Sequence, residues 1–202
     1  MDIKKFGAWG RAAELLASLP GRMEHARERA LLEEAQFFRT KIVEGMREQA
    51  PGGKAFAPLA PTTLAVRRFR GFKGTKALIV RGDLRNNIRV VKEKGRVFVG
   101  VLRTAKGRAG QPLVNIARIH EEGSKEITLN LTPKARRFLH AAFRNAGLPS
   151  AVGAERRTAV VIRIPARSYF SPVFDKYASN PDEVARRFLS RLALRLGANS
   201  DG

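Results

Sequence analysis

The residues that most often carry out catalysis are few in this chain, and their spacing does not favour a shared site. His25, His120 and His140 lie far apart, and the 202 residues include no cysteine. The sequence therefore predicts neither a zinc ligand set nor a thiol nucleophile. Glu121 and Glu122 are adjacent, so a strand or a helix directs them to different sides. No acid–base partner for either carboxylate is evident, and we expect no metal and no cofactor.

The common nucleophile and phosphate-binding motifs are also missing from the sequence. It contains no Gly-x-Ser-x-Gly and no Gly-x-x-x-x-Gly-Lys-Ser/Thr. The glycines and the lysine of residues 71–74 have no predicted strand before them and no helix start after them, which indicates a flexible basic loop. We expect that the protein is not an enzyme.

Positive charge is the dominant chemical feature of the chain. The formal net charge is +21, from 39 lysines and arginines against 18 acidic residues. Residues 63–118 hold 15 basic and 2 acidic side chains, and residues 133–170 hold 8 and 1. Such a field attracts polyanions and acidic protein surfaces alike, and it repels itself in a compact chain. We therefore expect a partner that neutralises it.

The candidate contact residues lie in a basic stretch from Ala57 to Val91 and in a loop at about 103–112. Phe69 and Phe72 are interleaved with the basic residues of 67–76, which suits base stacking or burial in a docking arm equally well. The loop lacks apolar anchors, which predicts mobility, and a solvated loop tip explains it as well as a partner contact does. The candidates for contact with other subunits or DNA are Arg67, Arg68, Arg70, Lys73, Lys76, Arg81, Arg85, Arg103, Lys106, Arg108 and Arg167.

Arg167 is the one candidate that the sequence places on a stiff segment, because Pro165 and Pro172 flank it. Two interpretations stay open from the residues alone. The guanidinium forms a buried pair with a carboxylate of the same subunit, or it contacts a neighbouring subunit.

One long helix is predicted over residues 22–49. Apolar residues recur there at spacings of three and four, as expected for a face that packs on a core. Residues 6–19 are predicted as a separate short helix or a strand-like lead-in, stopped by Pro20-Gly21. A linker rich in proline and glycine covers 50–60, and with the residues after it forms an extended basic arm at about 51–85, with a helix start at Thr62 or Thr63. The stripe of the long helix consists of Leu31, Ala35, Phe38, Ile42 and Met46.

Strands are predicted at 87–91 and 96–102, joined by a hairpin turn at Gly95, and again at 127–131 and 158–164. A short apolar element at 114–124 separates the two pairs. Two further helices have clear starts. Thr132-Pro133 supplies an N-cap and a first-turn proline, and Asn180-Pro181 does the same before two acidic residues.

These elements predict a single α+β domain over residues 1–202. A small, mainly antiparallel sheet packs with a long N-terminal helix and a C-terminal helix, and arms and loops extend from it. No signal-like segment and no run of about 18 apolar residues is evident, so we expect a soluble intracellular protein without membrane contact.

The order of several fragments resembles that of the virion-morphogenesis (tail-completion) proteins of Mu-like tailed bacteriophages, within the neck and head–tail joining proteins. After a long N-terminal helix that ends in Ala-Pro, the fragments are PLAPTT and LIVRGDLRNNI, then IARIHEEG and LTPKARRFL, and finally IPARSYFS, and the resemblance covers roughly Met23 to Leu196. Residues 78–88 would be the extended approach to the sheet, residues 120–123 a His-x-x-Gly turn, and residues 165–167 the Pro-Ala-Arg part of the Ile-Pro-Ala-Arg signature. Members of the family commonly have Pro-Phe-Leu after this arginine, whereas the present chain has Ser168-Tyr169-Phe170.

The resemblance implies a structural virion protein at the head–tail junction, made in the host cytoplasm. It would form a homo-oligomeric ring, of which a hexamer is one example, around the DNA channel, in contact with neighbouring neck and tail proteins and with packaged DNA. Two alternatives stay open: a free nucleic-acid-binding protein that uses its basic arm and loop, and a transient tail-assembly chaperone. No recognition-helix or RNA-binding signature favours the first alternative.

Overall fold

The computed structural model describes residues 9–148 and 158–197. Its first element is helix α1 (Trp9–Glu48), which begins well before the predicted start at residue 22. Pro20 lies inside this helix, so the expected separate element ending at Pro20-Gly21 is wrong. A proline in a helix interior costs about 3 kcal/mol. The alanines, leucines and glutamate that precede it are strong helix formers, and the helix continues across it.

The chain divides into two compact units. Unit 1 comprises the residues up to 37 together with 90–99 and those from 180 onwards, and unit 2 comprises 38–89 and 100–179. Helix α1 and the hairpin of β1 (Ile88–Glu93) and β2 (Arg96–Val101) contribute residues to both. The expected single domain stays a prediction.

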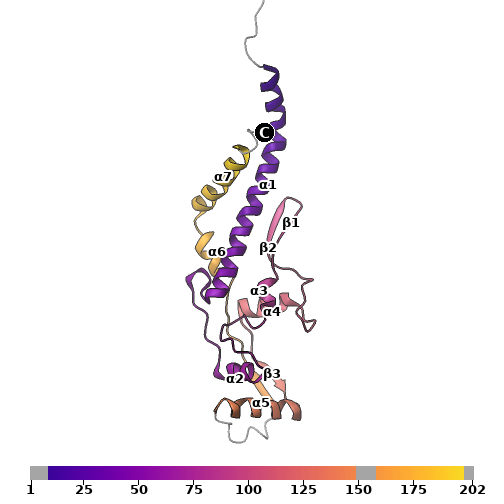
Figure 1. Ribbon diagram of the computed structural model, residues 1–202, viewed down its shortest axis with the longest axis vertical. Helices are drawn as coiled ribbons and strands as arrows, with labels where there is room; N and C mark the ends of the chain where they lie inside the picture. Colours follow the sequence, from indigo (N-terminus) through magenta and orange to yellow (C-terminus); the bar gives the residue numbers. More distant parts are fainter. Residues whose placement is uncertain (1–8, 149–157, 198–202) are drawn as a thin grey trace, which may run out of the picture. The chain divides into compact units, whose positions relative to one another are not determined.

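In unit 1, helix α7 (Pro181–Gly197) runs beside the N-terminal part of α1 (Figure 1). Arg187 Nη2 lies 2.9 Å from Oε1 of the buried Glu34, and the Arg187 guanidinium lies 4.9 Å from the centre of the Phe37 ring. Arg195 Nε donates to Glu33 at 2.8 Å. Asn180 accepts hydrogen bonds from the backbone N–H groups at 182 and 183, which confirms the predicted cap.

The core of unit 2 is built around the C-terminal part of α1. Phe38, Ile42 and Met46 of the predicted stripe are buried there, together with Tyr169 and Val173. A further helix that the sequence did not predict, α6 (Ser171–Tyr177), follows Tyr169. The Phe174 ring of α6 stacks on Phe38 with 4.7 Å between the ring centres. The predicted apolar element at 114–124 is helix α4 (Leu113–Glu122), which ends at Gly123.

The strands confirm the α+β class and divide between two two-stranded sheets. One is the β1–β2 hairpin, whose turn has positive φ at Lys94 and Gly95. The other is an antiparallel ribbon of β3 (Ile127–Asn130) and β4 (Ala159–Ile162), in which Ile127 pairs with Ile162. No helix in the described residues is both long and apolar enough to cross a membrane.

Much of the predicted arm at 51–85 is helical. It contains the short 3₁₀ helix η1 (Pro51–Gly53) and the helices α2 (Pro61–Phe69) and α3 (Asp83–Asn86). The helix start lies at Pro61 with Ala60 as N-cap, instead of at a threonine. Helix α2 lies against α5 (Pro133–Asn145) (Figure 1). This packing explains why this part of the predicted arm is not extended. The predicted Thr132 cap of α5 is confirmed, because its hydroxyl accepts from the Ala135 N–H at 3.2 Å.

Candidate interaction site

Residues 164–171 form a strap in unit 2, with no helix or strand before α6 begins at Ser171. The C-terminal end of α4 holds it by backbone hydrogen bonds. The Arg167 N–H donates to the His120 carbonyl at 2.6 Å, and the Ser124 N–H donates to the Ile164 carbonyl at 2.9 Å. Gly123 allows this approach because it has a φ of +84°, and a Cβ there would lie 3.1 Å from the Ala166 nitrogen. The predicted turn at 120–123 is thus the end of a helix.

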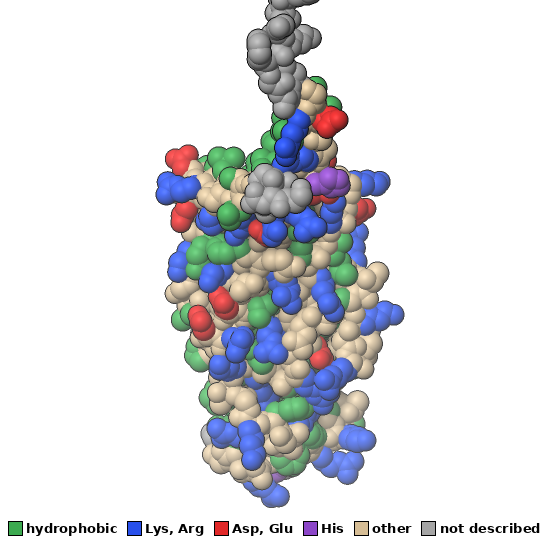
Figure 2. Space-filling model, turned by 45° about the horizontal axis from the view of Figure 1, so that its top comes forward, with side chains coloured by type: hydrophobic (Ala, Val, Ile, Leu, Met, Phe, Trp, Pro, Cys, Tyr) green, Lys and Arg blue, Asp and Glu red, His purple; other side chains and the backbone are tan. Residues whose placement is uncertain are grey.

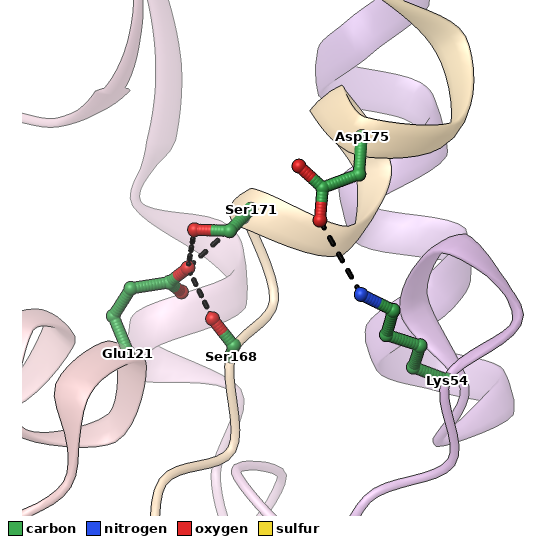
Figure 3. Close-up of polar contacts among 5 residues, drawn as sticks. All are labelled: Lys54, Glu121, Ser168, Ser171 and Asp175. Atoms are coloured by element: carbon green, nitrogen blue, oxygen red, sulfur yellow. Dashed lines mark hydrogen bonds and ion pairs between the residues drawn. The ribbon is translucent and has the colours of Figure 1, made fainter. Parts of the chain in front are cut away.

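The carboxylate of Glu121 is the main anchor of the strap. It accepts hydrogen bonds from the Tyr169, Phe170 and Ser171 N–H groups at 2.8, 3.1 and 2.9 Å. The hydroxyls of Ser168 and Ser171 donate to it at 2.5 and 2.8 Å (Figure 3). Burial alone would raise the pKa of Glu121, but these bonds to its ionised form outweigh burial and hold the pKa below its usual value. A negative charge is favourable at this place because it faces the first N–H groups of α6.

Arg167 fastens the strap to the segment that precedes α2. Only 6% of the residue is exposed. Its Nε donates to the Ala57 carbonyl at 2.9 Å and its Nη2 to the Pro58 carbonyl at 3.0 Å. The interpretation of Arg167 as half of a buried pair with a carboxylate is therefore wrong, since its partners are backbone carbonyls. A role between subunits stays a prediction.

Two ionisable groups close to the residues that hold the strap are kept neutral. Burial, and then the charge of Arg167, lower the pKa of His120. Burial, and then the charge of Glu121, raise the pKa of Tyr169. Among the described residues, the Nδ1 of His120 and the hydroxyl of Tyr169 are buried and have no hydrogen-bond partner. Both groups therefore act as packing surfaces around the strap.

The end of the strap is fixed against η1. A Cβ on Gly52 would lie 2.0 Å from the Pro172 carbonyl oxygen, so only glycine fits there. Lys54, just after η1, forms an exposed ion pair with Asp175 of α6 at 3.3 Å (Figure 3). Surface pairs of this kind contribute little, so the close backbone packing is what fixes α6 at this end.

Several of the predicted contact arginines and lysines are tied to the protein itself. Arg67, in the last turn of α2, donates to the Lys76 carbonyl at 2.8 Å, and Lys76 donates to the Arg47 carbonyl at 2.6 Å. Burial, and then the charge of Arg167, lower the pKa of Arg67. Arg108 lies 3.4 Å from Asp83. These contacts stabilise unit 2 locally, and whether the same residues also contact a partner stays a prediction.

The two phenylalanines between the basic residues already face side chains of the same chain. The Arg81 guanidinium lies 5.0 Å from the centre of the Phe72 ring. Phe69 meets Phe138 of α5 edge-on, with 5.4 Å between the ring centres, and Arg70 lies 5.1 Å from the Phe138 ring centre. Both rings therefore pack on side chains of the same chain, although Phe69 is still 42% exposed, and base stacking stays a prediction.

The remaining candidates lie at the surface of unit 2. Arg68 and Lys73 are exposed, and Arg85 donates to the side chain of its neighbour Asn86 at 3.1 Å. The loop with Arg103 and Lys106 is exposed too, and a single β-bridge between residues 106 and 112 closes it. Its mobility stays a prediction. Of the candidates, the structure brings Arg67 close to Lys76 and to Arg167.

Sequence reasoning missed two sets of residues. It considered Glu121 only for acid–base chemistry, because the serines that bind it lie 47 and 50 residues away and no local spacing links them. It also left out the basic residues of α5. The excess of positive charge over residues 133–170 was the signal that pointed to them.

The model of one protein family, described as the phage virion morphogenesis family, matches residues 14–177. This range contains α4, the strap and α6, and it ends before α7 begins. A search of curated proteins and a search of solved structures each gave no significant match.

Proposed function

Because this chain belongs to the phage virion morphogenesis family, we propose that it is a structural tail-completion protein at the head–tail junction of a tailed bacteriophage. Membership of this family indicates a role in building the phage particle. The proposal adds where and how the protein acts. It assembles in the host cytoplasm as a ring of identical subunits, contacts neighbouring neck and tail proteins in the virion, and works by binding and without catalysis.

The observation that carries the ring is the β3–β4 ribbon. Directly paired residues share a face of a ribbon, so Ile127, Ile162, Leu129 and Val160 lie on one face. All four are apolar, and Ile127, Leu129 and Ile162 are 37%, 44% and 38% exposed. A two-stranded ribbon is only marginally stable in water by itself. A monomer that leaves this face in solvent therefore favours association.

The edges of the ribbon support the same mode of contact. In the described part of the chain β3 and β4 pair only with each other, so each has one side without a strand partner. Such an edge is suited to the addition of a strand from another chain, in which backbone hydrogen bonds provide affinity and alternate side chains provide specificity. A strand of a neighbouring subunit placed there would extend the sheet, and another part of the same subunit would cover the apolar face.

The first test is the amount of this chain in purified mature particles, measured by quantitative mass spectrometry against a major tail protein. A small and fixed number of copies per particle is the expected result. Absence from particles, combined with abundance in the infected cell, would overturn the proposal and favour a transient assembly chaperone.

A further inference from the structure

The excess of positive charge is located in unit 2. Residues 38–89 and 100–179 hold 26 lysines and arginines against 8 acidic residues, whereas the rest of the chain holds 13 against 10. Within unit 1, acidic side chains such as Glu33 and Glu34 pair with arginines of α7. Unit 2 has too few acidic residues to neutralise its own basic ones. Its charge is therefore available to a partner.

Helices α2 and α5 form one basic surface within unit 2. Their contact is apolar: Ala65 and Ala142 are buried, and Phe69 meets Phe138. Neither helix contains an acidic residue. The basic residues of the pair, including the residue that follows α2, are Arg67, Arg68, Arg70, Lys134, Arg136, Arg137 and Arg144. Helices α2 and α5 lie at the lower end of Figure 1. At the lower end of Figure 2, blue side chains are visible and red ones are not.

The exposed members of this set are arranged in a row. Lys134, Arg137 and Arg144 are exposed on α5, and at 100° per residue they fall within an arc of about 80° and span about 15 Å along the helix. Arg68 and Arg70 are exposed at the end of α2. Arg70 lies over the ring of Phe138, which falls between Lys134 and Arg144 along the axis of α5 and about 40° outside their arc. None of the ion pairs found among the described residues involves these five side chains.

We infer that the α2–α5 surface binds the phosphate backbone of duplex DNA. Duplex DNA carries one negative charge per about 1.7 Å of axis when both strands are counted, so a length of about 15 Å holds about nine phosphates, of which the row faces those on one side. Protein interfaces are enriched in arginine and in aromatic residues, and their cores are depleted in charged residues. The exposed row of α5 contains no large apolar or aromatic side chain that could form such a core, which favours the phosphate backbone of DNA over an acidic protein as the partner.

The identification of that DNA as the phage genome rests on the proposed function, because the genome passes the head–tail junction on its way into the tail. The contact itself needs no particular base sequence, since backbone contacts position a protein on DNA without reading it. Binding in solution therefore tests the surface independently of the particle. A chain that is absent from virions can still bind DNA, and a virion protein can fail to bind it.

The test is binding of the full chain to a fluorescent duplex of about 30 base pairs, roughly three helical turns, by anisotropy over a range of salt concentrations. Two unrelated duplex sequences are used. Circular dichroism spectra and unfolding midpoints confirm that each variant is folded. The α5 triple variant is Lys134→Gln, Arg137→Gln and Arg144→Gln. The control triple variant removes the same charge from exposed residues of unit 1 and is Lys94→Gln, Arg96→Gln and Arg186→Gln.

Each lost phosphate contact reduces the slope of log affinity against log salt by about 0.9. We therefore expect the α5 triple variant to lower the slope by about 2 to 3, while the control triple variant keeps the wild-type slope. Equal slopes for the two variants would overturn the inference, as would a wild-type chain that does not bind either duplex. Poly-glutamate that displaces the duplex at an equal concentration of charge would identify an acidic protein as the partner instead.

Discussion

Ser171 donates two hydrogen bonds to the same oxygen of Glu121, one from its backbone N–H at 2.9 Å and one from its hydroxyl at 2.8 Å. This pair joins the end of α4 to the start of α6 across 50 residues of sequence. Tyr169 and Phe170 donate to the second oxygen of the same carboxylate. One side chain therefore determines where the strap turns into a helix.

Substitution of Glu121 by Gln tests the strap anchor. The amide keeps the shape of the side chain but replaces one acceptor oxygen with an NH₂ group, which leaves N–H and O–H donors of the strap without a partner. We expect a loss of about 1 to 3 kcal/mol in the free energy of unfolding, measured by urea titration. The control is Glu122→Gln, whose exposed side chain predicts a change within about 0.5 kcal/mol. Equal effects of the two variants would contradict the assigned role.

Acid should weaken the same anchor. The folded state lowers the pKa of Glu121 from its ordinary 4.5, so its contribution is complete above that value and is lost as the pH falls through the folded pKa. Between these two pKa values the unfolded chain binds a proton that the folded chain does not. Urea titrations at a series of acidic pH values should therefore show a shallower loss of stability in Glu121→Gln than in the wild type. If the free energies of unfolding of the two proteins fell in parallel with pH, the role of Glu121 as the anchor of the strap would be contradicted.

His120 predicts a second pH effect at a higher pH. Burial and the charge of Arg167 lower its pKa below 6.5, so the unfolded chain takes up a proton before the folded chain does. The free energy of unfolding should fall as the pH drops below about 6.5, the ordinary value for histidine. His120→Gln should remove this part of the dependence, whereas His25→Gln, at an exposed position, should retain it. An unchanged profile in His120→Gln would contradict the prediction.

Two neighbouring glycines of η1 allow the loss of stability from a steric clash to be measured apart from the loss that backbone strain causes. Gly52 and Gly53 both have positive φ, but an added Cβ meets the Pro172 carbonyl only at Gly52 and open space at Gly53. Gly53→Ala should lower the free energy of unfolding by about 1 to 2 kcal/mol through strain alone. Gly52→Ala should add about 1 to 3 kcal/mol for overpacking. Denaturant titration of both variants measures the difference, and equal losses would show that η1 is not held against α6.

The ribbon predicts an asymmetry between its two faces. Leu129 and Val161 are 44% and 59% exposed and lie on opposite faces. Threonine at either position keeps a high preference for strands, so the ribbon itself should persist. Leu129→Thr should reduce the number of copies per particle at least several-fold, and Val161→Thr should leave it near the wild-type value. Similar copy numbers for the two variants would exclude the apolar face as the subunit contact.

Sequence reasoning succeeded where the deciding interactions are local. Thr132-Pro133 and Asn180-Pro181 begin helices as expected, because a cap and a first-turn proline act within one turn of the helix. The same type of local rule failed at Pro20, where the strong helix formers around the proline outweigh the single lost hydrogen bond.

Local rules could not predict the hydrogen bonds that hold the strap, because the residues that form them are distant in sequence. Glu121 binds residues 47 to 50 positions later, and Arg167 binds carbonyls 109 and 110 positions earlier. The sequence indicated a stiff segment that carries Arg167, but it left the partner of the guanidinium open between a carboxylate and a neighbouring subunit, and the backbone carbonyls were not considered. Only the tertiary arrangement of α4 and the segment before α2 identifies what holds it.

Among the described residues the β3–β4 ribbon has two open edges of different kinds, so a contact that pairs the β3 edge of one subunit with the β4 edge of the next is directional. When an edge of one kind accepts a neighbour, the edge of the other kind is still available, and a chain of subunits keeps growing. Growth stops without a cap only when the last subunit meets the first. The number of subunits is then determined by the rotation between neighbours, so a small change in that angle yields a ring of another size or an open filament.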